Sequence, residues 1–253
     1  MLLKDKVAIV TGATGGIGRA VIHKLCSEGA KVAGLYRSQD IVAEEIQSEL
    51  AEHGFETSFY KGSISDEAYI AQTFKSIKDK FGKIDILVNN AGITRDTFLA
   101  QMQIDEWKAV FETNFLGTYM CTQEVLPYLL ESSNPSEGKY GRVINIISIS
   151  GVLGREAQAN YCASKGAVIG LTRLLSREYS DKGIYFNALA PGLIETEMIG
   201  HLPENKRNGM INSTNMKRMG KADEVAGAVL FLCSSLSDYC NNTVLKIDGG
   251  MLR

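Results

Sequence analysis

The sequence predicts an α/β fold, in which about seven parallel strands form one doubly wound sheet with helices on both faces. Three observations predict it. Short β-branched apolar runs alternate with longer helical patterns, a glycine-rich turn follows the first run, and no stretch of linker composition divides residues 1–253. Such alternation is typical of parallel strands joined by right-handed helical crossovers. We therefore expect one domain over the whole chain.

The elements follow from the same patterns, taken in chain order. Strands are expected near residues 6–11, 31–36, 55–60, 84–88, 142–147, 184–189 and 243–247. Helices are expected near residues 16–28, 40–53, 66–80, 103–130, 157–180 and 222–235. Two longer loops remain, at 132–139 and 192–220. A loop as long as the second, inside a compact domain, is more often a functional lid than a plain connection.

Composition excludes several classes of protein. The chain has 253 residues, of which 45% are hydrophobic, and a net charge of −2, so no basic surplus points to nucleic acid. No apolar stretch is long enough for a membrane span, and Lys4-Asp5-Lys6 follow the start too closely for a signal peptide. We expect a cytoplasmic protein, or one in an organelle lumen after transit-peptide removal. Five cysteines without C-x-x-C spacing and three scattered histidines predict no metal site.

The glycine-rich turn predicts a dinucleotide site. The run Val7-Ala8-Ile9-Val10 leads into Thr11-Gly12-Ala13-Thr14-Gly15-Gly16-Ile17-Gly18 and then into a helical pattern. A dinucleotide pyrophosphate needs close backbone approach and the unpaired N–H groups of a helix N-terminus, as in a Rossmann fold. The spacing G-x-x-x-G-x-G differs from the usual fingerprint G-x-G-x-x-G. The alternative interpretation is a tight strand-to-helix turn without a ligand.

A tyrosine and a lysine in the second half of the chain predict a proton donor. Tyr161 and Lys165 stand four residues apart on an expected helix, so they share one face. The lysine ammonium can then lower the pKa of the phenol. Ser148, at the end of an apolar run, lies thirteen residues before the tyrosine. Each residue taken alone is more often structural, as a turn serine or a surface pair.

These motifs together resemble the short-chain dehydrogenase/reductase family over the full chain. The resemblance rests on T-G-x-x-x-G-I-G, Asn89-Asn90-Ala91-Gly92, Asn114, Ser148, Tyr161-x-x-x-Lys165 and Pro191-Gly192, in that order. Local matches at 89–96, 158–161, 190–198 and 247–251 look most like the 3-oxoacyl-[acyl-carrier-protein] reductases of type II fatty acid synthesis. That resemblance implies NADPH-dependent reduction of a 3-oxoacyl group to the 3-hydroxyacyl product. An alternative is another ketone or alcohol, such as acetoacetyl-CoA. A non-catalytic nucleotide-binding protein is disfavoured, because it needs no proton donor.

The resemblance also implies a role for each residue. Tyr161 would donate a proton to the ketone oxygen, Lys165 would lower the tyrosine pKa and hold the nicotinamide ribose, and Ser148 would bind the carbonyl oxygen. Asn114 would support a water that connects the lysine to solvent. The implied cofactor contacts are Gly12, Thr14, Gly16, Ile17, Gly18, Arg37, Ser63, Ile64, Asn90, Ala91, Gly92, Tyr161, Lys165, Pro191, Gly192, Ile194 and Thr196.

The end of the second expected strand favours NADPH over NADH. An NAD enzyme typically has an acidic residue there, whereas Arg37 offers a planar fork to a 2′-phosphate. A solvated arginine is the alternative interpretation. Gly15 stands where many of the resembled reductases have a basic residue, and Ser63-Ile64 replaces a common Asp-Val at the adenine ring, so affinity for the cofactor could be modest.

Two further expectations concern partners. The resembled reductases act on an acidic acyl carrier protein, and Lys139 and Lys182 fall where they often have basic docking residues, which predicts these lysines on the rim of the cleft. Members of the family mostly form homotetramers. Residues 103–130 and 157–180 are long and apolar on more than one face, which suits helices that pack against a partner subunit.

Overall fold

The computed structural model describes residues 1–197 and 204–251. Within these residues, seven parallel strands form one sheet in the order β3-β2-β1-β4-β5-β6-β7, which confirms the predicted fold class. The strands are β1 (Val7–Thr11), β2 (Lys31–Tyr36), β3 (Thr57–Lys61), β4 (Ile86–Asn89), β5 (Gly141–Ile146), β6 (Ile184–Pro191) and β7 (Val244–Ile247).

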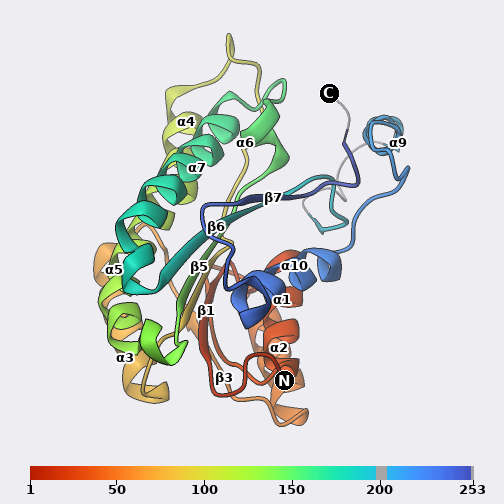
Figure 1. Ribbon diagram of the computed structural model, residues 1–253. Helices are drawn as coiled ribbons and strands as arrows, with labels where there is room; N and C mark the ends of the chain where they lie inside the picture. Colours follow the sequence, from red (N-terminus) through yellow and green to blue (C-terminus); the bar gives the residue numbers. More distant parts are fainter. Residues whose placement is uncertain (198–203, 252–253) are drawn as a thin grey trace.

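The helices lie on both faces of this sheet (Figure 1). They are α1 (Gly16–Ser27), α2 (Asp40–Glu52), α3 (Glu67–Phe81), α4 (Ile104–Phe111), α5 (Gly117–Ser132), α6 (Ile149–Leu153), α7 (Ala159–Tyr179), α9 (Glu204–Asn212) and α10 (Ala222–Cys233). One face carries α1, α2 and α10, and the other carries α3, α5 and α7. None of the helices in the described part of the chain is long and apolar enough to span a membrane.

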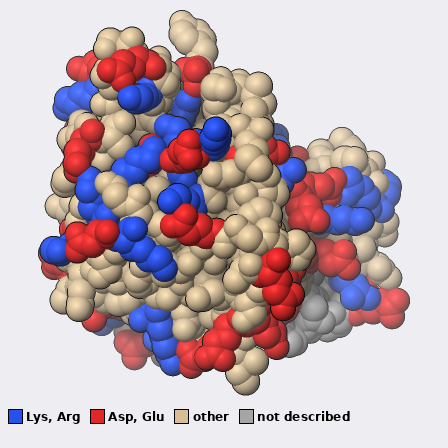
Figure 2. Space-filling model, turned by 90° about the horizontal axis from the view of Figure 1, so that it is seen from below, with Lys and Arg blue, Asp and Glu red and all other residues tan. Residues whose placement is uncertain are grey.

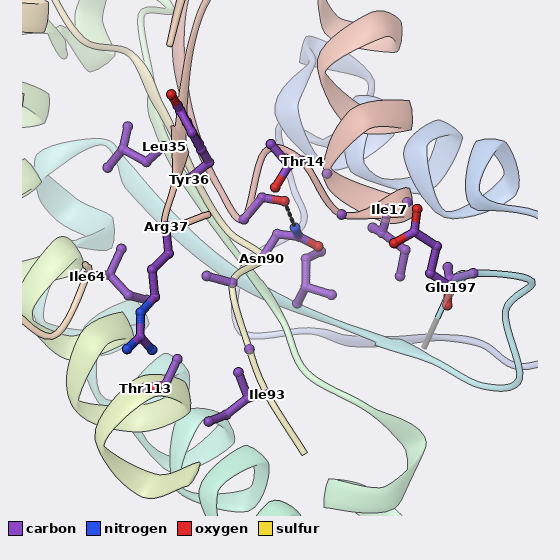
Figure 3. Close-up of a pocket in the computed structure, with 18 of the residues that line it drawn as sticks. Thr14, Ile17, Leu35, Tyr36, Arg37, Ile64, Asn90, Ile93, Thr113 and Glu197 are labelled. Carbon is purple, nitrogen blue, oxygen red and sulfur yellow. Dashed lines mark hydrogen bonds between the residues drawn. The ribbon is translucent and has the colours of Figure 1, made fainter. Parts of the chain in front are cut away.

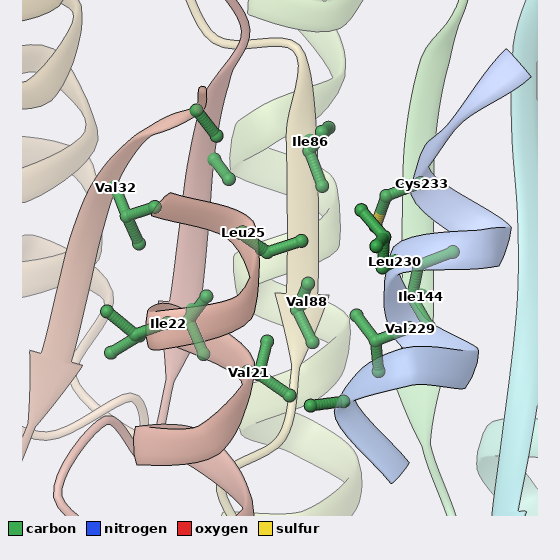
Figure 4. Close-up of a cluster of buried hydrophobic side chains, with 14 of the residues drawn as sticks. Val21, Ile22, Leu25, Val32, Ile86, Val88, Ile144, Val229, Leu230 and Cys233 are labelled. Atoms are coloured by element: carbon green, nitrogen blue, oxygen red, sulfur yellow. The ribbon is translucent and has the colours of Figure 1, made fainter. Parts of the chain in front are cut away.

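Each face of the sheet has its own apolar core. On the α1 face, Leu25 of α1 packs with Ile86 of β4 and Val229 of α10, all three fully or almost fully buried (Figure 4). On the opposite face, Phe74 of α3 and Phe186 of β6 are buried in a second cluster. Both faces of the central strands are covered, which explains why their sequences read as continuous apolar runs rather than alternating ones.

The chain reverses its direction of winding at β1, and this positions the functional site. β1 pairs with β2 on one side and with β4 on the other, so the connections after β1 and β4 run to opposite faces of the sheet. A crevice forms at the carboxyl ends of the strands where the winding reverses. The glycine-rich turn that follows β1 and the segment Asn90–Gly92 that follows β4 therefore meet there.

The expected helix over 103–130 is divided. Between α4 and α5 lies a π-helical segment, Glu112–Leu116, and the buried Asn114 is at its centre. A π-helical turn holds one more residue than an α-helical turn and occurs mostly as a short bulge near functional sites. Amphipathic periodicity does not reveal such a bulge, because the apolar pattern continues on both sides of it.

Two short helices lie outside the expected set. α6 begins directly after Ser148, whose side chain accepts a hydrogen bond from the Ser150 backbone N–H at 3.1 Å. α9 lies inside the segment 192–220, which was expected to be a loop. Both are too short to give a clear period of 3.6 residues. Part of the expected lid, residues 198–203, lies outside the described residues.

Candidate active site

A cavity of about 680 Å³ opens at the carboxyl ends of the strands. Its lining comes from the segments that follow β1, β2, β3, β4, β5 and β6, and from α7. All the residues expected to bind a cofactor line it: Gly12, Thr14, Gly16, Ile17, Gly18, Arg37, Ser63, Ile64, Asn90, Ala91, Gly92, Tyr161, Lys165, Pro191, Gly192, Ile194 and Thr196. Ser148 lines it as well. The structure thus brings residues from the whole chain into one site.

The glycines of the first turn leave room that no other residue could leave. A Cβ on Gly18 would lie 2.1 Å from the Gly12 carbonyl oxygen, and Gly12 itself has φ of 67°, a left-handed conformation that suits glycine. A Cβ on Gly16 would lie 3.1 Å from the Thr196 methyl group. The backbone is therefore free to approach a ligand closely at this turn.

The same turn provides an anion site. α1 begins at Gly16, and its cap residue Gly15 supplies no side-chain hydrogen bond. Its first four residues, Gly16 to Arg19, carry no negative charge. The first N–H groups of a helix have no partner inside the helix, and they carry partial positive charge. The cradle of small residues and these N–H groups together fit the pyrophosphate of a dinucleotide.

A set of hydrogen bonds fixes the turn after β1 against the turn after β4. The Thr11 hydroxyl accepts from the backbone N–H groups of Asn90 and Ala91, both at 3.0 Å. The Asn90 amide in turn donates to the carbonyl oxygens of Thr11 at 3.0 Å and Gly12 at 3.2 Å. Figure 3 shows Asn90 in this position between the two turns. These hydrogen bonds fix the two walls of the cavity relative to each other.

Three of the four expected catalytic side chains line the cavity, Ser148 from the connection between β5 and α6 and both Tyr161 and Lys165 from α7. Tyr161 and Lys165 lie on one face of α7, with the lysine Nζ 5.8 Å from the centre of the tyrosine ring. Lys165 is buried and donates to the Ile146 carbonyl oxygen at 2.9 Å. The side chains of Ser148 and Tyr161 are hydrogen-bonded to each other. A hydroxyl pair next to a buried ammonium is an arrangement suited to proton transfer.

Burial sets the pKa values of this pair, in a way that the sequence did not predict. Burial raises the pKa of Tyr161 to about 12, and the hydrogen bond with Ser148 opposes that rise. Burial also lowers the pKa of Lys165 to about 8. The expectation was that the ammonium lowers the tyrosine pKa, but Lys165 directs its Nζ to a backbone carbonyl rather than to the phenol oxygen. The tyrosine is therefore a protonated phenol at neutral pH, ready to donate.

Asn114 stands directly behind the cavity and does not line it. Its Oδ1 accepts from the Ile93 backbone N–H at 2.8 Å, and its Nδ2 donates to the Ile93 carbonyl oxygen at 3.0 Å. A Cβ on Gly92 would lie 3.2 Å from Asn114 Oδ1 and 3.3 Å from Lys165 Nζ. Because Gly92 has no side chain, the space between Asn114 Oδ1 and Lys165 Nζ is left open. The water that was expected to connect the lysine to solvent, supported by Asn114, stays a prediction.

The opposite end of the cavity is formed by the segments after β2 and β3. Arg37 is exposed there, and its side chain extends toward Ile64 and Thr113 (Figure 3). It forms no ion pair with any residue in the described ranges. Ser63 and Ile64 line the same region, so the residues assigned to the adenine and the 2′-phosphate lie together. A guanidinium without an internal partner is available to a ligand phosphate.

Sequence reasoning missed part of the lining. The further lining residues are Gly15, Leu35, Tyr36, Ser38, Gln39, Gly62, Ile93, Arg95, Thr113, Ile146, Ile147 and Glu197. Most of them are direct neighbours of expected residues at strand ends, and that adjacency is the signal that could have found them. Thr113 belongs to the π-helical segment, which no periodicity in the sequence indicates.

The expectation for Lys139 and Lys182 is wrong for a single chain. Lys139 precedes the first residue of β5, and Lys182 precedes the first residue of β6, whereas the cavity lies at the carboxyl ends of these strands. Lys139 pairs with Glu137 at 2.6 Å. A parallel sheet puts the two ends of a strand at opposite edges, so a lysine that stands just before a strand lies away from this cavity. On the face seen in Figure 2, basic and acidic side chains are interspersed.

Comparison with known proteins shows the family to which the chain belongs. A family model described as short chain dehydrogenase matches residues 6–207. The 3-oxoacyl-[acyl-carrier-protein] reductase of Thermotoga maritima is 38% identical over 255 residues, 100% of both chains. The reductase of the same name from Salmonella typhimurium is 39% identical over 99% of both chains. Nodulation protein G of Azospirillum brasilense is 39% identical over 98% of this chain and 99% of its own. The resemblance in the motifs is thereby confirmed: the chain belongs to the short-chain dehydrogenase family, which uses a nicotinamide cofactor.

Proposed function

We propose that the chain reduces the 3-oxo group of an acyl chain carried on an acyl carrier protein, with NADPH, to the 3-hydroxyacyl product. One observation carries this proposal: Ser148, Tyr161 and Lys165 line the same cavity as the glycine-rich turn. The full-length similarity to two 3-oxoacyl-[acyl-carrier-protein] reductases supports the substrate class. Such a reaction belongs to type II fatty acid synthesis.

Each catalytic side chain has a distinct task in this reaction. The cofactor, when bound, supplies a hydride to the ketone carbon. Tyr161 donates its phenolic proton to the ketone oxygen as negative charge develops there. Ser148, already bonded to Tyr161, donates a hydrogen bond to the same oxygen and stabilises that charge. Lys165 stabilises the phenolate that remains, and Asn114 orders the route by which a proton returns to it.

The substrate assignment is tested by comparing acceptors. Initial rates would be measured with acetoacetyl-carrier protein, acetoacetyl-CoA and plain ketones, each with NADPH and with NADH. We expect the highest kcat/KM with acetoacetyl-carrier protein and NADPH. A higher value with acetoacetyl-CoA or a plain ketone would favour the alternative, a family member that acts on another ketone or alcohol. That alternative has the same catalytic residues and differs in the lid at 192–220, which we propose selects the substrate.

Arg37 is proposed to select NADPH. Arg37→Asp replaces the guanidinium with a carboxylate that repels the 2′-phosphate and can accept a hydrogen bond from a ribose hydroxyl. A charge-assisted hydrogen bond contributes about 1.5–3 kcal/mol, so the ratio of kcat/KM for NADPH to that for NADH should fall by about ten- to a hundredfold. Arg173→Asp serves as the control, because it makes the same change in charge on α7, outside the cavity lining. If the wild type already prefers NADH, the assignment is overturned.

We also propose that the chain forms a homotetramer. Large apolar side chains stay exposed in the helices expected to meet a partner subunit: Leu116 is 43% exposed, Tyr119 39% and Leu174 52%. Burial against a second copy would remove this apolar surface from water. Sedimentation equilibrium, which gives the mass of the assembly, measures it directly.

A further inference from the structure

An ion pair adjoins the end of the cavity where Arg37 lies. Lys61, the last residue of β3, places its Nζ 2.6 Å from the Oδ2 atom of Asp40, the first residue of α2. The side chain of Asp40 also accepts a hydrogen bond from the Tyr36 hydroxyl. About half of each charged side chain is exposed, 56% for Lys61 and 50% for Asp40. The pair is therefore a surface feature and not part of the core.

The pair lies next to the end of the cavity that is assigned to the ribose. Lys61 is the register partner of Tyr36 in the β2–β3 ladder. The lining includes residues 36–39 on one strand connection and residues 62–64 on the next, so Asp40 and Lys61 directly follow and precede lining residues. Three peptide units separate Arg37 from Asp40, and three steps of 3.8 Å keep their Cα atoms within about 11 Å. Figure 3 shows Tyr36 and Arg37 pointing in opposite directions.

The charges of the pair cancel at neutral pH. The hydrogen bond from Lys61 lowers the pKa of Asp40, and the same bond raises the pKa of Lys61, so both groups are ionised. An exposed pair of this kind contributes little to stability. Its effect is electrostatic: without the lysine, a lone carboxylate would stand near the strand end that carries Arg37, and at low salt, where the Debye length is about 30 Å at 0.01 M, its charge would reach a phosphate bound there.

We propose that Lys61 is a specificity-determining residue for the dinucleotide, because it neutralises Asp40 and so removes a charge that would repel a 2′-phosphate. The proposal rests on the NADPH preference proposed above and deepens it.

The experiment is a double-mutant cycle read by binding. Isothermal titration calorimetry would give Kd values for NADP⁺ and NAD⁺, and for adenosine 2′,5′-bisphosphate and AMP. Lys61→Met leaves a net charge of −1 at the pair, Asp40→Asn leaves +1, and the double variant leaves zero. Lys61→Met should weaken NADP⁺ binding by about three- to tenfold at low salt, less with added salt, with NAD⁺ unchanged. Asp40→Asn should tighten NADP⁺ binding, and the double variant should bind it within about twofold of wild type.

The matched control lies at the other end of the same two strands. Lys31, the first residue of β2, pairs with Glu56, which precedes β3, at 2.8 Å. A six-residue strand spans about 17 Å, which is more than the Debye length of about 10 Å at 0.1 M salt, so at that salt concentration Lys31→Met should leave all four Kd values unchanged.

Three results would overturn the proposal. These are an equal effect of Lys61→Met on both dinucleotides, no effect on either, or weaker NADP⁺ binding in Asp40→Asn. A wild type that binds NAD⁺ more tightly than NADP⁺ would overturn the NADPH preference instead. In that case, the ratio of Kd values for the bisphosphate and AMP still decides whether Asp40 acts on a 2′-phosphate. The two failures are thus distinguishable.

Discussion

Tyr161→Phe should lower kcat for the reduction by at least about a hundredfold, because it removes the phenolic proton donor from the cavity. The fold should tolerate the change. The ring stays in place on α7, and Ser148 keeps its hydrogen bond with the Ser150 backbone N–H at 3.1 Å. Single-turnover kinetics with saturating NADPH would measure the effect on chemistry, and calorimetry with NADP⁺ should give a Kd within about twofold of wild type.

Tyr179→Phe is the control for this variant. It removes a phenol oxygen from the same helix, at the last residue of α7 and outside the cavity lining, and should leave kcat unchanged. If Tyr161→Phe retained wild-type turnover, the tyrosine would not be the proton donor, and the mechanism proposed for this site would be wrong.

Lys165→Met should abolish most activity and change how stability depends on pH. Burial holds the pKa of Lys165 at about 8, below its ordinary value of 10.5, so the ionised lysine destabilises the folded state. This cost is complete below pH 8 and disappears as pH rises toward 10.5. Each pKa unit corresponds to about 1.36 kcal/mol. The free energy of unfolding of wild type minus that of the variant should therefore increase by about 3 kcal/mol as the pH rises through this range.

Urea unfolding of both proteins at pH 7 and at pH 10.5, at equal protein concentration, measures that change. The comparison cancels two other contributions, namely groups that titrate alike in both proteins and the hydrogen bond to the Ile146 carbonyl oxygen that the variant lacks. A difference in unfolding free energy that stays constant with pH would show that burial does not perturb Lys165.

The sequence predicted the sheet and most of the site for one physical reason. Parallel strands buried on both faces need continuous apolar runs, and the residues after each run must meet at one edge. Gly12, Asn90 and Pro191 could be assigned to the cavity in this way, and the structure places all three there. The family resemblance supplied roles that no pattern reveals, such as that of Asn114.

What the sequence could not predict depends on three-dimensional surroundings. The π-helical segment adds one residue to a single turn, which is too small a change for the apolar pattern to reveal. The pKa of Tyr161 depends on how deeply its phenol is buried and on where Lys165 directs its ammonium, and spacing along α7 gives neither. Lys139 and Lys182 are a different case. They precede the expected strands 142–147 and 184–189, so the sequence itself places them at the edge of the sheet opposite the carboxyl ends of the strands, and the resemblance was followed instead.

The π-helical segment also restricts how the chain between β4 and β5 can vary in length. A π-helical turn holds one more residue than an α-helical turn, so deleting one residue from Glu112–Leu116 could close the segment to an ordinary α-helix while α4 and α5 keep nearly the same orientation. The side chains within the segment would change direction instead, and the two hydrogen bonds by which Asn114 holds Ile93 would be lost. A single deletion here would thus remove the support for the segment after β4 even where α4 still packs against α7. Insertions and deletions in this part of the molecule should therefore be confined to the loops that flank the helices.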